Sequence, residues 1–197
     1  MSQAEHITGI ILAGGRSSRM GSEKGLLELH GKKMIEYIVA ALKPITSEII
    51  LVSANPGYSF LGYPLYPDLI KDCGPSGGIF TGLHHSSTEK NIVLSCDTPY
   101  INTAFLDYLI RNAGDEEITV PVFQTHTEAL CGIYSKNIQP RLGEIISGGE
   151  RKMTEILKQF RVNYLDTGAQ TQFDPRLIFR NINTREDLLE ANNIHTH

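Results

Sequence analysis

Short apolar runs alternate along this 197-residue chain with stretches in which apolar residues recur at helical spacing. Runs rich in β-branched residues and bounded by glycine, proline or polar residues predict buried strands. We expect such strands at residues 7–12, 48–53, 92–95, 117–123, 129–134 and 162–165. Helices are expected between them, over residues 34–42, 75–85, 104–111, 138–146, 153–160 and 185–191.

Individual residues sharpen several of these boundaries. Pro44 closes the first helix, because proline cannot continue a helical ladder. Asn102 is a suitable N-cap for the helix over residues 104–111, and Thr184 for the last helix, with Asp187 in place of the usual Glu of a capping box. Pro121 lies inside a predicted strand, which favours an edge or a bulged position for that strand.

Alternation of strands and helices predicts a three-layer, doubly wound α/β fold, with a mostly parallel sheet covered by helices on both faces. The length suits one domain over residues 1–197. In such folds, ligands bind beyond the carboxyl ends of the strands. Three segments follow predicted strands here, namely the glycine-rich loop after Leu12, residues 53–55 and residues 96–98. One ligand could contact all three.

The glycine-rich loop from Leu12 to Lys24 reads L-A-G-G-R-S-S-R-M-G-S-E-K. Glycines let backbone N–H groups approach a phosphate, and Arg16, Arg19 and Lys24 can neutralise a triphosphate. Neither G-x-x-x-x-G-K-[ST] nor G-x-G-x-x-G is present, which argues against a P-loop and against a Rossmann dinucleotide site. A purely structural turn is the alternative interpretation of the glycines.

Asp97 is the second candidate for chemistry, because it follows an apolar strand and precedes Thr98 and Pro99. Mg²⁺ usually takes one or two carboxylates, with substrate phosphates and water completing its shell. A carboxylate beside a phosphate-binding loop is well placed for this role. An aspartate that begins a turn before Pro99 is an equally good interpretation of the spacing alone.

Composition narrows the class of protein. The chain is 41% hydrophobic and 20% charged, and its net charge of −4 argues against a non-specific nucleic-acid-binding protein, which needs a basic surface. Cys73, Cys96 and Cys131 are widely spaced, so we expect reduced, mostly buried thiols rather than a disulfide scaffold or a zinc site. No apolar run reaches transmembrane length and residues 1–8 lack the features of a signal peptide, so we expect a cytoplasmic protein.

At these residues the chain resembles the molybdenum cofactor guanylyltransferase family. The resemblance rests on L-A-G-G-x-S-x-R-M-G-x-x-K followed by G-L-L-E-L, and on C-D-T-P-Y at 96–100, G-P with G-G at 74–78, G-E-R at 149–151 and N-I-N-T at 181–184. Sugar-phosphate nucleotidyltransferases usually have a G-T-R-L loop, and cytidylyltransferases of the group typically read L-A-A-G. This chain has Gly14 after Ala13, as the guanylyl enzymes do. The resemblance implies a Rossmann-like nucleotidyltransferase fold.

The resemblance assigns roles within the loop. Leu12, Ala13 and Gly14 match the backbone segment that contacts GTP, and Lys24 matches the phosphate-binding lysine of the motif. Arg19 and Lys24 are then expected to stabilise the pyrophosphate leaving group.

Further positions carry over from the resemblance. Asp68 matches an aspartate that helps to hold the guanine nucleotide, and Asp97 matches the residue that contacts both the nucleotide and Mg²⁺. Ser53 stands where some members have an asparagine that contacts the nucleotide. Asn181 and Asn183 match a late segment on the acceptor or metal side of the site.

The implied reaction transfers GMP from GTP to molybdenum-bound molybdopterin and releases pyrophosphate, with Mg²⁺ as cofactor. The terminal phosphate of molybdopterin is already anionic, so it can attack the α-phosphorus in line without a general base. Groups that bind molybdopterin are expected within residues 125–131, 149–152 or 181–183. Transient contact with proteins that insert or accept the cofactor is also expected, whereas nucleic acids and membranes are not expected partners.

Two alternatives stay open. One is a related nucleotidyltransferase that uses CTP or a different phosphorylated acceptor. The other is a nucleotide-binding adaptor that has lost catalysis, although the presence of both Lys24 and Asp97 argues against it.

Overall fold

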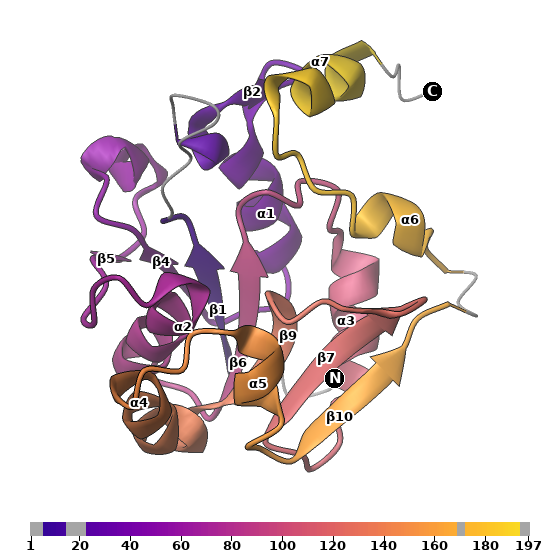
Figure 1. Cartoon of the computed structure of the whole chain (residues 1–197). Helices are drawn as coiled ribbons and strands as arrows, with labels where there is room; N and C mark the ends of the chain where they lie inside the picture. Colours follow the sequence, from indigo (N-terminus) through magenta and orange to yellow (C-terminus); the bar gives the residue numbers. More distant parts are fainter. Residues whose placement is uncertain (1–5, 15–22, 169–171, 194–197) are drawn as a thin grey trace.

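The fold is built on one eight-stranded sheet (Figure 1). The computed structural model describes residues 6–14, 23–168 and 172–193. The strands of this sheet are β1 (Ile7–Leu12), β4 (Glu48–Val52), β5 (Leu65–Tyr66), β6 (Lys90–Ser95), β7 (Ile118–Phe123), β8 (His126–Thr127), β9 (Cys131–Ser135) and β10 (Val162–Asp166). Their order across the sheet is β5-β4-β1-β6-β9-β7-β10, and β8 pairs with β7.

Most strands run in one direction. The strands β5, β4, β1 and β6 pair in parallel, as do β7 and β10. The exception along the main path is β9, which is antiparallel to both of its neighbours, β6 and β7. The carboxyl ends of β1, β4, β5, β6, β7 and β10 therefore lie at one edge of the sheet, and the amino end of β9 lies at the same edge.

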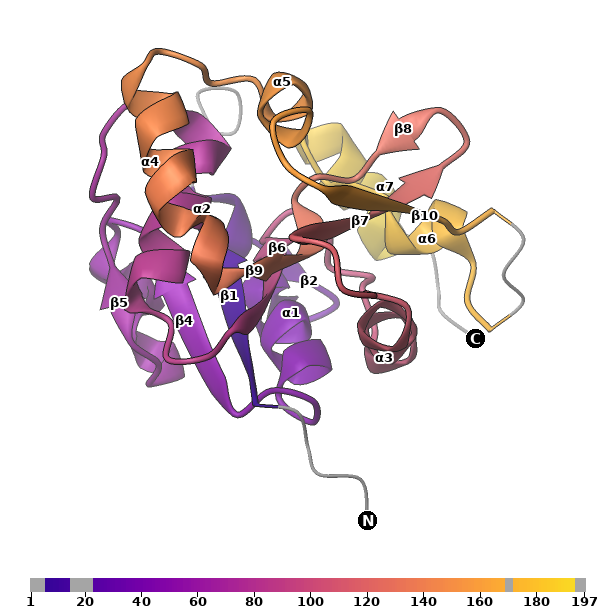
Figure 2. The same ribbon diagram turned by 90° about the horizontal axis from the view of Figure 1, so that it is seen from below.

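Helices cover both faces of this sheet, which confirms the predicted three-layer α/β fold. One face carries α1 (Met34–Leu42), α3 (Thr103–Arg111) and α6 (Pro175–Ile178). The other carries α2 (Gly74–His85), α4 (Gln139–Ser147) and α5 (Met153–Leu157). Figure 2 shows α2 and α4 on one side of the sheet and α1 and α3 on the other.

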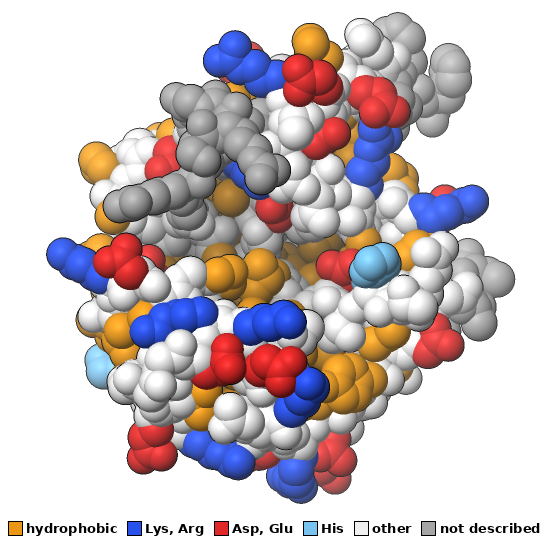
Figure 3. Space-filling model, in the orientation of Figure 1, with side chains coloured by type: hydrophobic (Ala, Val, Ile, Leu, Met, Phe, Trp, Pro, Cys, Tyr) orange, Lys and Arg blue, Asp and Glu red, His pale blue; other side chains and the backbone are white. Residues whose placement is uncertain are grey.

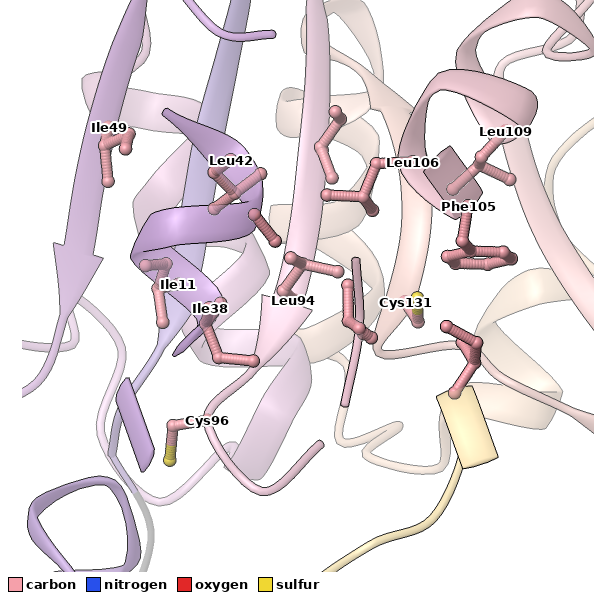
Figure 4. Packing of buried hydrophobic residues seen from close by; sticks show 14 of the residues in the cluster. Ile11, Ile38, Leu42, Ile49, Leu94, Cys96, Phe105, Leu106, Leu109 and Cys131 are labelled. Atoms are coloured by element: carbon pink, nitrogen blue, oxygen red, sulfur yellow. The ribbon is translucent and has the colours of Figure 1, made fainter. Parts of the chain in front are cut away.

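Alternate residues of each central strand supply the two halves of the core. In β1, Ile11 packs on the face that carries α1, whereas Ile10 packs on the face that carries α2. Figure 4 shows Ile38 and Leu42 of α1, together with Leu106 of α3, packed beside the sheet. Burial of each such side chain contributes about 1.5–3 kcal/mol to stability. Because both faces are covered, these strands appear in the sequence as continuous apolar runs.

Smaller elements surround the carboxyl edge. They are η1 (Lys24–Leu26), β2 (Glu28–Leu29), β3 (Lys32–Lys33), η2 (Pro56–Leu61) and the last helix, α7 (Arg185–Asn193), whereas η3 (Lys136–Ile138) follows β9 at the opposite edge. The strands β2 and β3 form a hairpin, on which α7 packs through a separate buried cluster that includes Leu29 and Ala191. The backbone N–H of His30 donates to Asn192 Oδ1 at 2.8 Å. Helix α7 is thereby attached to the β2–β3 hairpin, which follows the glycine-rich loop.

Each of the six predicted strands is present, with ends that differ from the prediction by two residues at most. The predicted helices are also present, but the one expected over residues 153–160 ends at Leu157. The N–H groups of Gln159 and Phe160 each donate to the carbonyl three residues back, so the chain tightens into turns there.

The predicted helix starts are confirmed. Asn102 Oδ1 accepts a hydrogen bond from the N–H of Phe105 at 2.9 Å. Thr184 Oγ1 accepts from the N–H of Asp187 at 3.0 Å, and Asp187 Oδ2 accepts from the N–H of Thr184 at 2.9 Å. This is the reciprocal pair of a capping box.

An edge position for the strand that contains Pro121 is wrong, because β7 lies between β9 and β10. The other possibility, a local interruption, fits better. The ladder of β7 with β9 ends at Thr119, and the ladder with β8 begins at Val122. On this side of β7, Pro121 therefore lies between two ladders, where its missing N–H is tolerated, whereas on the other side it pairs with Leu165 of β10.

The three cysteines are free and buried, as predicted. Within the described ranges, no helix is long and apolar enough to cross a membrane.

Candidate active site

The carboxyl ends of β1, β4 and β6 are joined by backbone hydrogen bonds beyond the strands themselves. The N–H of Ala13 donates to the carbonyl of Val52 at 3.0 Å, and the N–H of Cys96 donates to the carbonyl of Leu12 at 3.2 Å. The chain leaves β1 toward β4 on one side and later returns to β6 on the other, which makes this edge a topological switch point. Gly14, which follows Ala13, is exposed at this edge.

Lys24, Asp97 and Asn183 meet at this edge. Lys24 Nζ lies 3.4 Å from Asp97 Oδ2 and donates to Asn183 Oδ1 at 2.6 Å. The side chains of Lys24 and Asp97 are 23% and 21% exposed, so the pair is reachable from solvent but largely shielded from it. The sequence motifs predict that Lys24 binds phosphate and that Asp97 binds the metal. They do not predict the direct ion pair between these two side chains.

Residues 181–183 are held at the site by a backbone hydrogen bond. The N–H of Ile182 donates to the carbonyl of Asp97 at 2.9 Å, which fixes residue 183 beside the Asp97 side chain. Asp187 Oδ2 accepts from the N–H of Asn183 at 2.9 Å, and these backbone hydrogen bonds lower the pKa of Asp187. The start of α7 therefore sets the position of Asn183.

Asp68 lies between two glycines. A Cβ built on Gly14 would lie 4.0 Å from Asp68 Oδ2, and a Cβ built on Gly78 would lie 3.7 Å from Asp68 Oδ1. The side chain reaches solvent, yet the surrounding protein removes enough water to raise the pKa of the carboxyl. Among the described residues, a Cβ on Gly14 would meet no atom closer than Val52 O at 3.6 Å, so packing against them does not require glycine there.

Tyr58 is a buried residue of the site that sequence reasoning missed. Its hydroxyl donates to Glu23 Oε2 at 3.3 Å, and burial raises the pKa of the phenol, which stays protonated. A Cβ on Gly25 would lie only 2.9 Å from the Tyr58 hydroxyl and 3.3 Å from Cys96 Cβ. Tyr58 thus supports the residues on both sides of Lys24. No motif marks it, because η2 is an irregular connection.

Cys96 packs in the same place. Burial raises the pKa of its thiol to about 12, so it stays a protonated, small hydrophobic group beneath Asp97 rather than a nucleophile.

Other predicted positions have local roles in the fold. Ser53 is buried, and its Oγ accepts a hydrogen bond from the N–H of Asn55 at 3.1 Å, so it stabilises a turn. Arg151 donates to the carbonyls of Ile146 and Glu150, which engages its guanidinium with the end of α4. Asn181 is exposed, and its amide donates to Phe179 O at 3.4 Å.

Arg16 and Arg19 of the glycine-rich loop lie outside the described residues, so their predicted roles stay predictions.

The oxygen atoms at this edge suit a divalent cation. The Lys24 ammonium lies between a carboxylate oxygen of Asp97 and an amide oxygen of Asn183, so these two oxygens already converge on a positive charge. Carboxylate and amide oxygens are hard donors of the kind that Mg²⁺ prefers. No cluster of three or more His, Cys, Asp or Glu side chains that could hold a metal occurs in the described part of the chain. A resident metal would therefore depend on substrate oxygens as well.

The face of the molecule seen in Figure 1 is hollowed. Figure 3 shows the hollow between the part that carries α7 and the part that carries α4 and α5, with hydrophobic side chains on its floor. Lys and Arg side chains gather on the rim over the connection between α4 and α5. Asp and Glu side chains lie directly beside them, so this rim carries both signs of charge.

Known proteins share both the sequence and the fold. A model of the MobA-like NTP transferase domain matches residues 9–164. "Probable molybdenum cofactor guanylyltransferase" of Flavobacterium johnsoniae is 42% identical, over 95% of this chain and 97% of that protein. "Molybdenum cofactor guanylyltransferase" of Vibrio parahaemolyticus is 35% identical, over 96% and 97%.

Among solved structures, molybdopterin-guanine dinucleotide biosynthesis protein A from Archaeoglobus fulgidus has a TM-score of 0.80 at 28% identity, over 95% of this chain and 97% of that one. Coverage of this kind leaves no large part of either chain unmatched. These similarities confirm the family that the motifs predicted. The chain belongs to the molybdenum cofactor guanylyltransferase family and contains the MobA-like NTP transferase domain.

Proposed function

We propose that this protein transfers GMP from GTP to molybdenum-bound molybdopterin, forming the guanine dinucleotide cofactor and pyrophosphate. The observation that carries the proposal is the convergence of Lys24, Asp97 and Asn183 at the carboxyl edge, in a chain of this family. We infer one domain, with the nucleotide bound by the first half and the acceptor by the second. Because GTP is a cytoplasmic metabolite, we place the reaction in the cytoplasm.

Asp68 is the residue that we assign to guanine. Guanine presents a ring N–H and an amino group on one edge, and a carboxylate can accept both hydrogen bonds at once. Cytosine has an amino group beside a ring nitrogen that accepts, so it cannot satisfy a carboxylate in this way. A site built for such donors rejects a base that lacks them. The exposed backbone of Gly14, next to Asp68, leaves room for the base or ribose.

The phosphates are assigned to Lys24 and to the glycine-rich loop. Lys24 would turn from Asp97 toward the β- and γ-phosphates and neutralise the charge that develops on pyrophosphate. Asp97 and Asn183 would then offer their oxygens to Mg²⁺, which supplies positive charge at the phosphates when bound. Arg19 is expected to assist on the leaving group.

No general base is needed, because the attacking phosphate of the acceptor is ionised. The contribution of the protein is to hold two anions in line while it neutralises their charge. Tyr58, through Glu23 and Gly25, keeps the backbone of Lys24 in place for that purpose.

Pyrophosphate release tests the proposal. Purified protein is incubated with Mg²⁺ and either GTP or CTP, with and without molybdenum-bound molybdopterin. We expect release with GTP only when the acceptor is present, and slow or no release with CTP. Release with CTP but not with GTP, in the presence of the acceptor, would identify a cytidylyltransferase. Nucleotide binding without release from either donor would favour the non-catalytic adaptor and contradict the proposal.

A further inference from the structure

Glu128 lies in a rigid turn at the carboxyl edge, in the connection from β8 to β9. Its N–H donates to the carbonyl of Pro121 at 2.9 Å, and its own carbonyl accepts from the N–H of Cys131 at 3.0 Å. One residue later, the carbonyl of Ala129 accepts a hydrogen bond at 2.5 Å from the hydroxyl of the buried Tyr134. The backbone that carries Glu128 is therefore fixed on both sides.

The antiparallel pairing of β6 with β9 places Glu128 and Asp97 at the same edge of the sheet, on neighbouring strands. Leu94 pairs with Cys131, and one step further the N–H of Ser95 donates to the carbonyl of Leu130 at 3.0 Å. Asp97 follows β6 by two residues and Glu128 precedes β9 by three, so both lie at the carboxyl edge where these two strands meet. Burial raises the pKa of the Glu128 carboxyl, and the negative charge of Asp97 adds to this shift.

Contacts among the described residues do not account for the carboxylate of Glu128. Its side chain is partly buried, and in the described residues it forms neither a hydrogen bond nor an ion pair. Burial is the main cause of its raised pKa, and the charge of His126 opposes that shift only in part. A partly buried, unpaired carboxylate costs folding free energy, so its presence beside the catalytic carboxylate points to a ligand.

The position of Glu128 restricts that ligand. Asp68 lies on the side of Gly14 and Gly78, which is the nucleotide side, whereas Glu128 comes from the second half of the chain across Asp97. Phosphate groups would be repelled by another carboxylate. Groups with N–H donors would instead be bound, since a carboxylate only accepts.

Pterins carry such donors. Their 2-amino-4-oxo-pyrimidine ring presents the same ring N–H and amino group as guanine. We propose that Glu128 binds this edge of the acceptor and thereby selects a pterin as the second substrate. The proposal rests on the function proposed above. Guanine and the pterin present the same pair of donors, and the proposal assigns guanine to Asp68 and the pterin to Glu128.

Equilibrium dialysis of molybdopterin against the full-length protein, without GTP, tests this assignment independently of turnover. Glu128→Gln keeps the size of the side chain but replaces one acceptor oxygen by an amide NH₂ group, which can only donate. We expect it to weaken molybdopterin binding at least tenfold, while binding of GTP, measured in the same way, changes less than twofold. Asp68→Asn is the matched control, and it should weaken GTP binding while leaving molybdopterin binding unchanged.

Thermal unfolding of both variants separates a lost contact from a lost fold. The transition midpoints should equal or exceed that of the wild-type protein, because each variant removes an incompletely solvated charge. Unchanged molybdopterin binding by Glu128→Gln would overturn the assignment. A weakened affinity for Mn²⁺ with normal pterin binding would overturn it too, in favour of a second metal ligand. Failure of GMP transfer by a wild-type protein that binds molybdopterin through Glu128 would contradict the proposed function alone.

Discussion

The two halves of the candidate site are built from opposite strand directions. On the nucleotide side, β1, β4 and β5 all run toward the carboxyl edge, so the groups at the site follow their strands in sequence, as Gly14 and Asp68 do. On the acceptor side, β9 runs the other way, so Glu128 precedes its strand. A search for polar residues after strands therefore finds the first half of the site and misses the second.

Asp97 belongs to both halves, because it follows β6, which is parallel to β1 and antiparallel to β9. Its loss should therefore have the largest effect. We expect Asp97→Ala to lower kcat by on the order of a hundredfold or more, because a central electrostatic group is removed. Steady-state pyrophosphate release measures this. Asp107→Ala, which removes an exposed partner of Arg111 in α3, is the control and should behave as wild type. Near-normal turnover of Asp97→Ala at saturating Mg²⁺ would refute its role.

We expect Lys24 to contribute more to the binding of GTP than to the binding of molybdopterin. Lys24→Ala removes the ammonium that contacts Asp97 and Asn183, and we expect GTP binding to weaken and kcat to fall, each by about tenfold. Binding of molybdopterin should change far less. GTP and molybdopterin affinities of the variant, measured side by side, sharpen the division between the halves. An unchanged KM for GTP together with an unchanged kcat would remove Lys24 from the site.

Gly14 should act on the choice of donor alone. Its added Cβ would find ordinary contact distances of 3.6–4.0 Å in the protein, so Gly14→Ala should fold normally. We expect the ratio of kcat/KM for GTP to that for CTP to fall about tenfold, because a methyl group intrudes on a site shaped for guanine. Competition assays with both nucleotides give this ratio directly. A variant with wild-type preference for GTP would show that Asp68 or another group selects the donor.

The smallest expected effect concerns stability against pH. Burial raises the pKa of Asp68 and Glu128 above their values in the unfolded chain, so folding favours the protonated forms. Ionisation at neutral pH therefore lowers the free energy of unfolding, and this loss is recovered as the pH falls through the raised pKa values. Asp68→Asn and Glu128→Gln should match or exceed the wild-type midpoint near neutral pH, with the difference shrinking in acid. A lower midpoint at neutral pH would mean that either carboxylate has a partner that stabilises the fold.

Much of the fold was predictable because its strands are buried on both faces. Runs such as residues 7–12 are apolar throughout, and glycine, proline or polar residues bound them. The two-residue strands β2, β3, β5 and β8 were not predicted, since only pairing with a distant segment defines them. The tightening of the chain after Leu157 was missed for a similar reason, because no local signal ends that helix.

The candidate site was predictable in its residues but not in its contacts. The rule that ligands bind at strand ends brought Gly14 and Asp97 together from the sequence, and the structure agrees. The contact between Lys24 and Asn183 joins residues 159 positions apart, and it depends on α7 packing against the β2–β3 hairpin. Periodicity carries no information about such a contact. Tyr58 was not predicted as a residue of the site for the same reason, because its role depends on how closely Gly25 approaches it.

The fate of the α-phosphate tests the central claim most directly. GTP labelled at the α-phosphorus is incubated with the protein, Mg²⁺ and molybdenum-bound molybdopterin, and the labelled products are separated. We predict that the α-label enters a pterin dinucleotide in step with the release of unlabelled pyrophosphate, and that Asp97→Ala slows both to the same extent. Recovery of the α-label in GDP or in unreacted GTP, with no labelled pterin, would contradict guanylyl transfer at this site.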